Sequence, residues 1–248
     1  KNEFYFKANI LTLVSKLLCL LIFIPLTLVI LSSHEYSDNW NHIKEFLLLK
    51  YTFSTFILVI GVGILSLIFG VGTAWIVSVY EFYGRKIIQW LLIIPLTIPT
   101  YIIAYSYYDI LDYFNPIYIW ARENYGSNSL ILIDSLVIYT VVISLFTFVL
   151  YPYVYLSTKA SLSIQGNRLI EAAYTLKFSP FESFFKVMLP VLKPAIIAGL
   201  SLVIMETLND YGAVEYFGIS TLTIGIFRSW FGMNDLIGAI KISTYLLG

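Results

Sequence analysis

Five long apolar runs most constrain what this chain can fold into. Each holds about 20 or more mostly apolar residues, the length that an α-helix needs to cross the hydrocarbon core of a bilayer. They occupy residues 10–31, 51–79, 88–108, 130–151 and 192–211, and a sixth begins near Leu236. The chain is 59% hydrophobic and 12% charged, about half the charged share of a soluble domain. The sequence therefore predicts an all-α integral membrane protein, a polytopic helical bundle with five full transmembrane helices and the start of a sixth.

The same composition argues against several classes of protein. The formal net charge is zero, so no basic surface points to nucleic acid as a partner. The one cysteine, Cys19, leaves no internal disulfide and no cysteine-based zinc site. His34 and His42 match no standard metal-ligand spacing, so we expect a solvated loop around them and no metal site.

The two ends of the sequence indicate a piece of a longer polypeptide. The chain begins at Lys1 rather than at Met, and it stops at Gly248 within an apolar stretch. We therefore interpret residues 1–248 as one transmembrane domain that is incomplete at its C-terminus.

The basic residues of the polar segments predict the orientation in the membrane. If the N-terminus is cytoplasmic, the inside segments hold nine basic residues, namely Lys1, Lys7, Arg85, Lys86, Lys159, Arg168, Lys177, Lys186 and Lys193. The outside segments then hold four, namely Lys44, Lys50, Arg122 and Arg228. Cytoplasmic loops carry the excess of Lys and Arg, so we expect the N-terminus and residues 152–191 in the cytoplasm. Lys16 and Lys241 fall within apolar runs.

Glycine and proline mark two of the apolar runs. The second run holds a small-residue cluster made of Gly61, Gly63, Gly70 and Gly72. It lacks the third small residue and the preceding strand of a nucleotide-binding loop, so we interpret it as a surface for close helix packing. Pro95 and Pro99 remove backbone donors from the third run and should kink or break that helix. Such a break either lines a cavity or serves packing alone.

The polar segment between the fourth and fifth runs carries its own helix signals. Asn167 can cap a first short helix that runs to Leu176. Ser179 and Glu182 can form a capping box around Pro180, which is tolerated at the first position of a helix. The apolar side chains that follow are Phe181, Phe184, Phe185 and Met188. Two helices joined by a sharp turn would present an apolar face to a partner protein. The alternative is an amphipathic hairpin that lies on the membrane interface.

A spaced motif also runs through this segment. It comprises Glu171, Ala172, Ala173, Lys177, Val187, Leu189 and Pro190. The motif resembles the EAA loop of permease subunits of binding-protein-dependent ABC importers, the MetI-like permeases. The resemblance implies a MetI-like permease fold in which residues 152–191 form a cytoplasmic coupling loop. It also implies that Glu171, Ala172 and Ala173 contact the ATPase and that Leu189 and Pro190 end the second helix of the loop.

The sequence departs from the family pattern at two positions. Val187 replaces Ile, which is conservative, and Lys177 replaces Gly. A Gly after a helix commonly takes the left-handed conformation, which costs Lys about 1 kcal/mol. Either the turn differs in this chain, or Lys177 pairs with an acidic group of the ATPase.

A polar cluster closes the fifth run. Its members are Glu206, Asn209, Asp210 and Tyr211. Glu206 and Asp210 are four residues apart and share a helix face. Ionisable groups at membrane depth face a bundle interior or an aqueous path by default, which makes this cluster a candidate translocation path that attracts cations. The alternative is an ordinary helix end whose carboxylates are hydrated.

The segment 205–218, continuing through 221–231, resembles the first half of ferric-iron importer permeases. Those permeases commonly fuse two such halves in one polypeptide, so the resemblance implies ferric iron as the solute and a first permease half. Permeases for thiamine, polyamines or other small solutes share the EAA loop and remain alternatives. An ion-coupled secondary transporter is an alternative of a different class. A membrane-embedded enzyme is disfavoured because both histidines lie outside the spans.

The chain carries no phosphate-binding loop of the form Gly-x-x-x-x-Gly-Lys-Ser/Thr. We therefore expect no enzymatic activity and no cofactor in this chain, with ATP and Mg²⁺ bound by a partner ATPase. The resemblance implies a place in the bacterial cytoplasmic (inner) membrane, surrounded by lipid. It also implies cytoplasmic ATPase subunits, an extracytoplasmic substrate-binding protein and a second permease half as partners.

Overall fold

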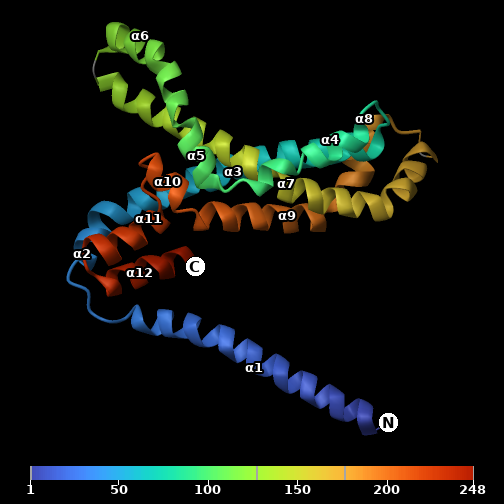
Figure 1. The fold of residues 1–248 in the computed structure, drawn as a ribbon, viewed down its shortest axis with the longest axis horizontal. Coiled ribbons are helices and arrows are strands. Elements are labelled where there is room, and N and C mark those ends of the chain that lie inside the picture. The colour runs from blue at the N-terminus through green and yellow to red at the C-terminus, as the bar shows by residue number, and fades with distance from the viewer. Residues whose placement is uncertain (1, 127, 176, 248) are drawn as a thin grey trace. The chain divides into compact units, whose positions relative to one another are not determined.

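The computed structural model describes residues 2–126, 128–175 and 177–247, and every regular element in these ranges is helical (Figure 1). The α-helices are α1 (Asn2–Ser32), α2 (Trp40–His42), α3 (Leu48–Val79), α4 (Arg85–Leu91), α5 (Thr100–Tyr107), α6 (Asn115–Tyr125), α7 (Asn128–Thr175), α8 (Pro180–Glu182), α9 (Leu189–Asn209), α10 (Gly212–Tyr216), α11 (Leu222–Phe227) and α12 (Leu236–Leu247). Two 3₁₀ segments, η2 (Ile94–Thr97) and η3 (Tyr108–Phe114), and three π segments, η1 (Ile43–Leu47), η4 (Ser183–Met188) and η5 (Arg228–Gly232), lie between them. The all-α prediction is confirmed.

The described helices include the predicted membrane spans. Four stretches are long and apolar enough to cross a bilayer, and they are Ile10–Ser32, Trp40–Val79, Leu130–Ile164 and Ser183–Asn209. A fifth is a bent pair, Arg85–Thr97 with Thr100–Tyr107, and α12 is a shorter apolar helix. These stretches match the five predicted spans and the start of a sixth. Several are longer than predicted because helices continue into the polar segments that flank the apolar runs.

The third span is broken where the prolines predict it. Its two halves meet at 87°. Pro95 lies in the 3₁₀ segment η2, and Pro99 has extended backbone immediately before α5. Proline cannot donate a backbone hydrogen bond, and it disfavours helical geometry in the residue before it, here Ile98. The predicted break is therefore confirmed.

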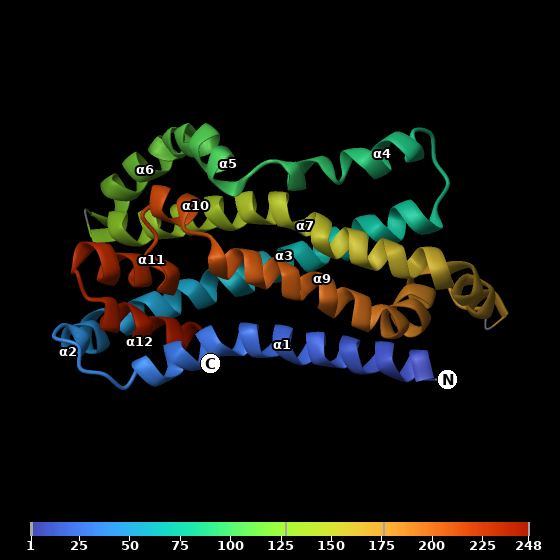
Figure 2. The same ribbon diagram turned by 60° about the horizontal axis from the view of Figure 1, so that its bottom comes forward.

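The chain divides into two compact units. The first comprises residues 1–52 and 221–248, and the second comprises residues 53–220. In the first unit, buried Ile43, Tyr51, Leu222 and Ile242 form a core between η1, the start of α3, α11 and α12 (Figure 2). Gly225 makes this packing possible, because a Cβ atom there would lie 2.6 Å from Cδ2 of Tyr51.

In the second unit, α7 and α9 lie side by side in both views (Figures 1 and 2). Gly199 of α9 fits against Ser157 and the α7 backbone, where a Cβ atom has no room. The predicted packing role of the α3 glycines is confirmed in part. A Cβ atom at Gly61 would lie 2.6 Å from Ile143, and one at Gly70 would lie 2.6 Å from Val154, whereas Gly72 faces open space.

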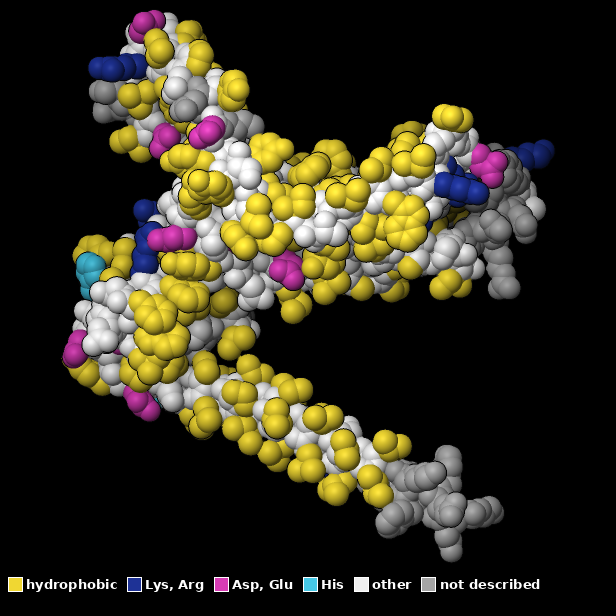
Figure 3. Space-filling model, in the orientation of Figure 1, with side chains coloured by type: hydrophobic (Ala, Val, Ile, Leu, Met, Phe, Trp, Pro, Cys, Tyr) yellow, Lys and Arg dark blue, Asp and Glu magenta, His cyan; other side chains and the backbone are white. Residues whose placement is uncertain are grey.

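The apolar side chains of the spans are largely exposed in the isolated chain. Figure 3 shows them along the described length of α1 and over the second unit, with Lys and Arg side chains at the α4–α8 end of that unit. In α1, for example, Leu17 is 58% exposed and Leu21 is 68% exposed. Surfaces of this extent are rare on proteins that face water, and they are what helices surrounded by lipid or by other apolar helices present.

Candidate coupling loop and translocation path

The predicted coupling loop, residues 152–191, begins inside α7. That helix runs from Asn128 to Thr175, so the separate helix start predicted at Asn167 is wrong. Gly166, which precedes Asn167, costs a helix interior about 1 kcal/mol, and this is too little to interrupt a helix of 48 residues. The side chains of Glu171, Ala172 and Ala173 lie outside the described residues, and their contact with an ATPase stays a prediction.

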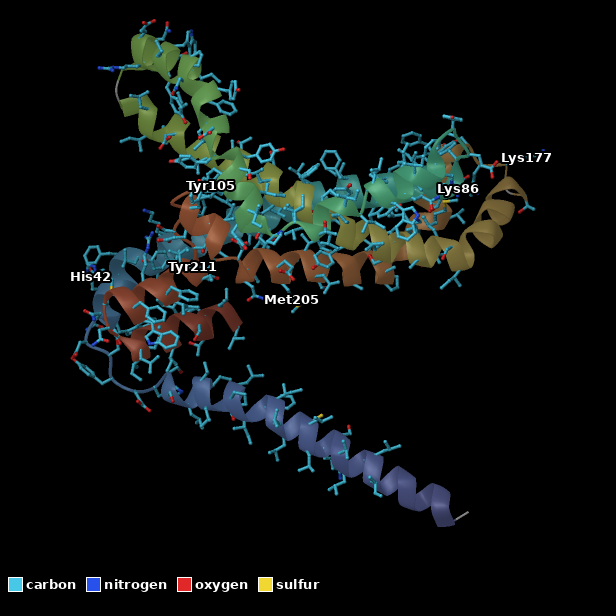
Figure 4. The ribbon with its side chains drawn as sticks, viewed as in Figure 1. His42, Lys86, Tyr105, Lys177, Met205 and Tyr211 are labelled. Atoms are coloured by element: carbon cyan, nitrogen blue, oxygen red, sulfur yellow. The ribbon has the colours of Figure 1, made fainter. Side chains whose placement is uncertain are left out.

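Lys177 forms the turn after α7 (Figure 4). Its φ angle is +56°, in the left-handed region that the family reaches with Gly. Lys177 thus takes a backbone conformation that Gly would adopt at no cost, and Lys bears a cost of about 1 kcal/mol there. Its side chain is exposed, and its pairing with an acidic group of the ATPase stays a prediction.

The predicted capping box at the start of the next helix is confirmed. The Ser179 amide donates to Oε2 of Glu182 over 3.1 Å, and the Glu182 amide donates to Oγ of Ser179 over 3.3 Å. The ammonium of Lys186 donates to Oε1 of Glu182 over 2.9 Å. Hydrogen bonds from Lys186 and then from Ser179 lower the pKa of Glu182 to about 2. The loop therefore re-enters a helix at a well-defined residue.

The second loop helix does not end at Leu189 and Pro190, and this prediction is wrong. Both residues lie in the first turn of α9, which follows directly on the π segment η4 (Ser183–Met188). Pro190 has no backbone N–H to donate, yet the helix continues past it directly after the π segment. A π turn adds one residue to the helical turn, and the Leu189 amide accordingly donates to the carbonyl of Phe184. Helix from Pro180 to Asn209 is thus continuous through η4, with Val187 inside it.

The aromatic residues of this helix divide between two faces. Phe184 and Met188 are 9% and 2% exposed, and the Phe184 ring lies 4.8 Å from the Trp75 ring of α3. Phe181 and Phe185 are 68% and 54% exposed, with their rings stacked 5.9 Å apart. The single apolar face predicted for the four residues is therefore wrong, because neighbours in a helical sequence point about 100° apart. Phe181 and Phe185, four residues apart, share the exposed face, and Phe184 and Met188 share the buried one. Phe184 fixes the loop to α3. Phe185 is presented outward, and Phe181 is exposed with its ring edge-on to Trp75 at 6.2 Å.

At the other end of α9, Asp210 connects three segments. Its Oδ1 atom accepts hydrogen bonds from the amides of Ala213 over 2.9 Å and Val214 over 3.3 Å, at the start of α10. Its Oδ2 atom accepts from the Thr100 hydroxyl at the start of α5, where the third span is broken. Both oxygens of this half-buried carboxylate are thus used inside the protein.

The other predicted path residues are more exposed than Asp210. Glu206, Asn209 and Tyr211 are all exposed, and Tyr211 is 39% exposed. The phenol of Tyr153 on α7 donates to Oε1 of Glu206 over 3.4 Å, which is a long hydrogen bond. The face of α9 that carries Glu206 and Asn209 also exposes Ser201 and Met205 (Figure 4). The opposite face, made of Leu192, Ile196, Gly199, Val203 and Thr207, is buried.

The structure adds an aromatic cluster that the sequence analysis missed. The Tyr216 ring lies 5.7 Å from Tyr105 and 5.0 Å from Tyr108, and Phe217 lies 5.8 Å from Tyr108. The cluster joins α5 and η3 to α10, next to the segments that Asp210 ties together. A signal was present, since residues 101–108 hold four tyrosines at Tyr101, Tyr105, Tyr107 and Tyr108.

The two candidate regions lie toward opposite ends of the second unit. Lys86 and Lys177 lie at the end where α3 and α7 finish, whereas Tyr105 and Tyr211 lie toward the other end (Figure 4). The orientation with the N-terminus inside stays a prediction. Among the described residues, no group of three or more His, Cys, Asp or Glu side chains could hold a metal ion.

Comparison with known proteins identifies the family. Residues 66–247 match the model of the binding-protein-dependent transport system inner membrane component family. The chain belongs to this family. It is 28% identical over 204 residues to the sulfate transport system permease protein CysT of Salmonella typhimurium, covering 80% of this chain and 70% of that protein. A probable sulfate permease of Prototheca wickerhamii is also 28% identical, over 202 residues that cover 78% of this chain and 75% of that protein.

A third relative transports iron. The Fe(3+)-transport system permease protein FbpB 2 of Haemophilus influenzae is 25% identical over 177 residues, covering 71% of this chain and 31% of that protein. This permease chain is thus a membrane subunit of a transport system and not a catalytic enzyme. A binding-protein-dependent family implies an ATPase and a substrate-binding protein as partners.

Proposed function

We propose that this permease subunit carries sulfate across the membrane, driven by ATP hydrolysis on a partner subunit. The sulfate permease of Salmonella typhimurium is 28% identical over 204 residues, whereas the iron permease is 25% identical over 177 residues. This proposal replaces ferric iron as the preferred solute and keeps iron as a second candidate. A second permease half would complete the pore, and the polar side chains exposed on α9 support this part of the proposal.

The observation that carries the coupling part of the proposal is the unbroken path from loop to pore. The helix that begins at the Ser179 capping box continues through η4 into α9 and ends beside Asp210. Phe181 and Phe185 would seat in the ATPase, while Phe184 holds the same turn against Trp75. A shift of the ATPase would therefore move α9 as a lever, because no flexible linker separates the contact from the span.

The chemistry of the α9 face is compatible with an oxyanion. Asn209 offers neutral hydrogen-bond groups on the exposed face, and the Ser201 hydroxyl on the same face donates to the carbonyl of Ile197 and keeps its acceptor lone pairs. The charge of Asp210 is compensated by two backbone amides and the Thr100 hydroxyl, so it would repel an anion less than a bare carboxylate. Neutral groups can contact a doubly charged anion without trapping it, whereas the exposed carboxylate of Glu206 on the same face would repel it.

Ferric iron remains the second candidate because of one arrangement on the same face. Glu206 is exposed, and its carboxylate lies beside the phenol of Tyr153. Carboxylate and phenolate oxygens are hard ligands of the kind that bind hard cations. If the solute is a cation, Glu206 is the side chain that would attract it.

Uptake into proteoliposomes tests the proposal. The vesicles would hold the full-length permease with its ATPase, and purified binding protein would supply sulfate, ferric iron, thiamine or a polyamine. ATP-dependent uptake of sulfate alone is the expected result. Ferric uptake alone would replace sulfate with iron, and uptake that ignores ATP would overturn the importer class in favour of a secondary transporter.

A charge-neutral variant separates the two solutes within one preparation. Glu206→Gln keeps the size of the side chain and removes its charge. For sulfate we expect uptake to be unchanged or higher, because a repulsive charge is lost. For ferric iron we expect a loss of tenfold or more, on the order of one charge-assisted contact. Met205→Gln, on the same exposed face, is the matched control.

A further inference from the structure

The first unit contains a polar pocket that the proposed transport path does not use. It has a volume of about 430 Å³ and is lined by Ser33, His34, Trp40, Lys241, Thr244 and Tyr245. These residues come from the turn that follows α1, the start of α2 and one face of α12. Trp40 is the first residue of the second apolar stretch. If that stretch spans the bilayer, the pocket lies at the level of the lipid headgroups.

Lys241 is the unusual member of this pocket. It lies in the apolar helix α12, where a cation is costly unless it is paired. Neither of the ion pairs found among the described residues, Arg85–Glu81 and Lys186–Glu182, involves it. Its ammonium instead lies 5.4 Å from the centre of the Trp40 ring, and the Tyr245 ring lies 5.9 Å from the same ring. Aromatic faces hold a cation in place without neutralising its charge.

The pocket is rich in hydrogen-bond donors and poor in acids. The Lys241 ammonium, the Trp40 indole N–H and the Tyr245 hydroxyl can all donate, and none makes a hydrogen bond to another described residue. The carboxylate of Asp235, in the same unit, is occupied by the Ser37 hydroxyl and the Gly238 amide, each over 2.7 Å. Nothing on the pocket wall competes with an incoming anion for the ammonium.

We propose that this pocket binds a tetrahedral oxyanion group. Lys241 supplies the charge, and Trp40 and Tyr245 supply neutral donors around it. Two sources share this chemistry, the phosphate of an anionic phospholipid headgroup and free sulfate. Basic and aromatic side chains at the membrane surface are typical of the former. Binding of free sulfate in this pocket rests on the proposed function, and binding of a lipid phosphate does not.

The test measures binding to the purified full-length permease, not transport. Native mass spectrometry would measure retention of phosphatidylglycerol against phosphatidylcholine, and equilibrium dialysis would measure binding of radiolabelled sulfate. In Lys241→Gln we expect about tenfold weaker binding of the anion that occupies the pocket. Lys44→Gln, an exposed lysine of the same unit, is the matched control and should leave both measurements unchanged.

Each outcome decides the proposal. A loss confined to phosphatidylglycerol assigns the pocket to lipid, and a loss confined to sulfate assigns it to the solute. Equal binding by wild type and Lys241→Gln in both measurements overturns the proposal. Tyr245→Phe removes only a hydroxyl and should weaken the same anion about threefold. It serves as the deciding variant if Lys241→Gln does not fold. Because uptake is not measured, the result is readable even if the transported solute proves not to be sulfate.

Discussion

Replacing Asp210 with Ala should loosen the junction between α9, α10 and the broken third span. The substitution leaves the amides of Ala213 and Val214 without their acceptor and the Thr100 hydroxyl without its partner. A charged acceptor is involved in all three hydrogen bonds, and the carboxylate is only partly accessible to water. The effect should therefore exceed that of an ordinary surface substitution.

The magnitude follows from the two roles of Asp210. Loss of a helix-capping acceptor costs about 1 kcal/mol. Loss of a hydrogen bond to a charged group that joins two segments costs about 2 kcal/mol. We expect Asp210→Ala to lower the free energy of unfolding by about 3 kcal/mol, and Asp210→Asn, which keeps an acceptor oxygen, by about 1 kcal/mol.

Unfolding by SDS in mixed micelles measures these differences on the purified chain. Asn209→Ala is the control, because Asn209 is exposed and should change the free energy of unfolding by less than about 0.5 kcal/mol. An Asp210→Ala protein as stable as the wild type would refute the structural role. If Asp210→Asn instead keeps full stability and abolishes uptake, Asp210 is a path residue, as the sequence analysis first proposed.

Three further predictions concern the coupling loop. Phe184→Ala should destabilise the chain by about 3 kcal/mol, because its packing on Trp75 is lost. Phe185→Ala should leave the stability unchanged and reduce co-purification of the ATPase. The reverse pattern would contradict the assignment of the two residues to different faces. Lys177→Gly should raise the free energy of unfolding by about 0.5–1 kcal/mol by removing left-handed strain, and slower proteolysis of the loop is the measurement. The folded-state pKa of Glu182 is lowered to about 2 from the ordinary 4.5. Its contribution to stability should therefore be present above pH 4.5 and disappear as the pH falls through 2, and Glu182→Gln should abolish that part of the pH dependence.

Much of the fold was predictable because its causes are local. Apolar run length determines where helices can span a bilayer, and proline chemistry determines where the third span breaks. The capping box at Ser179 and Glu182 depends on residues three apart, so it was predictable as well. The departure at Lys177 was also visible in the sequence, together with its cost.

The errors arose where helix ends depend on more than local signals. Asn167 can cap a helix and Pro190 can end one, yet helix continues through both positions. A cap or a proline permits a helix boundary without requiring one. At Pro190 the helix continues directly after a π turn, which holds one more residue than a regular turn. The split of Phe184 and Phe185 between two faces follows from helix geometry, since neighbours in sequence point about 100° apart. Only the packing of Phe184 on Trp75 decides which of the two faces is buried.

The sequence by itself determined the class of this protein: a helical membrane subunit with a structured polar loop and a polar cluster at the end of its fifth span. These features depend on composition and short spacings, which need no partner segment. Only the tertiary structure decided what the polar residues do. Asp210 meets Thr100 across 110 positions of sequence, and Trp40 meets Lys241 across α2 and α12. Such contacts arise when helices pack, because packing alone determines which side chains lose water and which partners replace it.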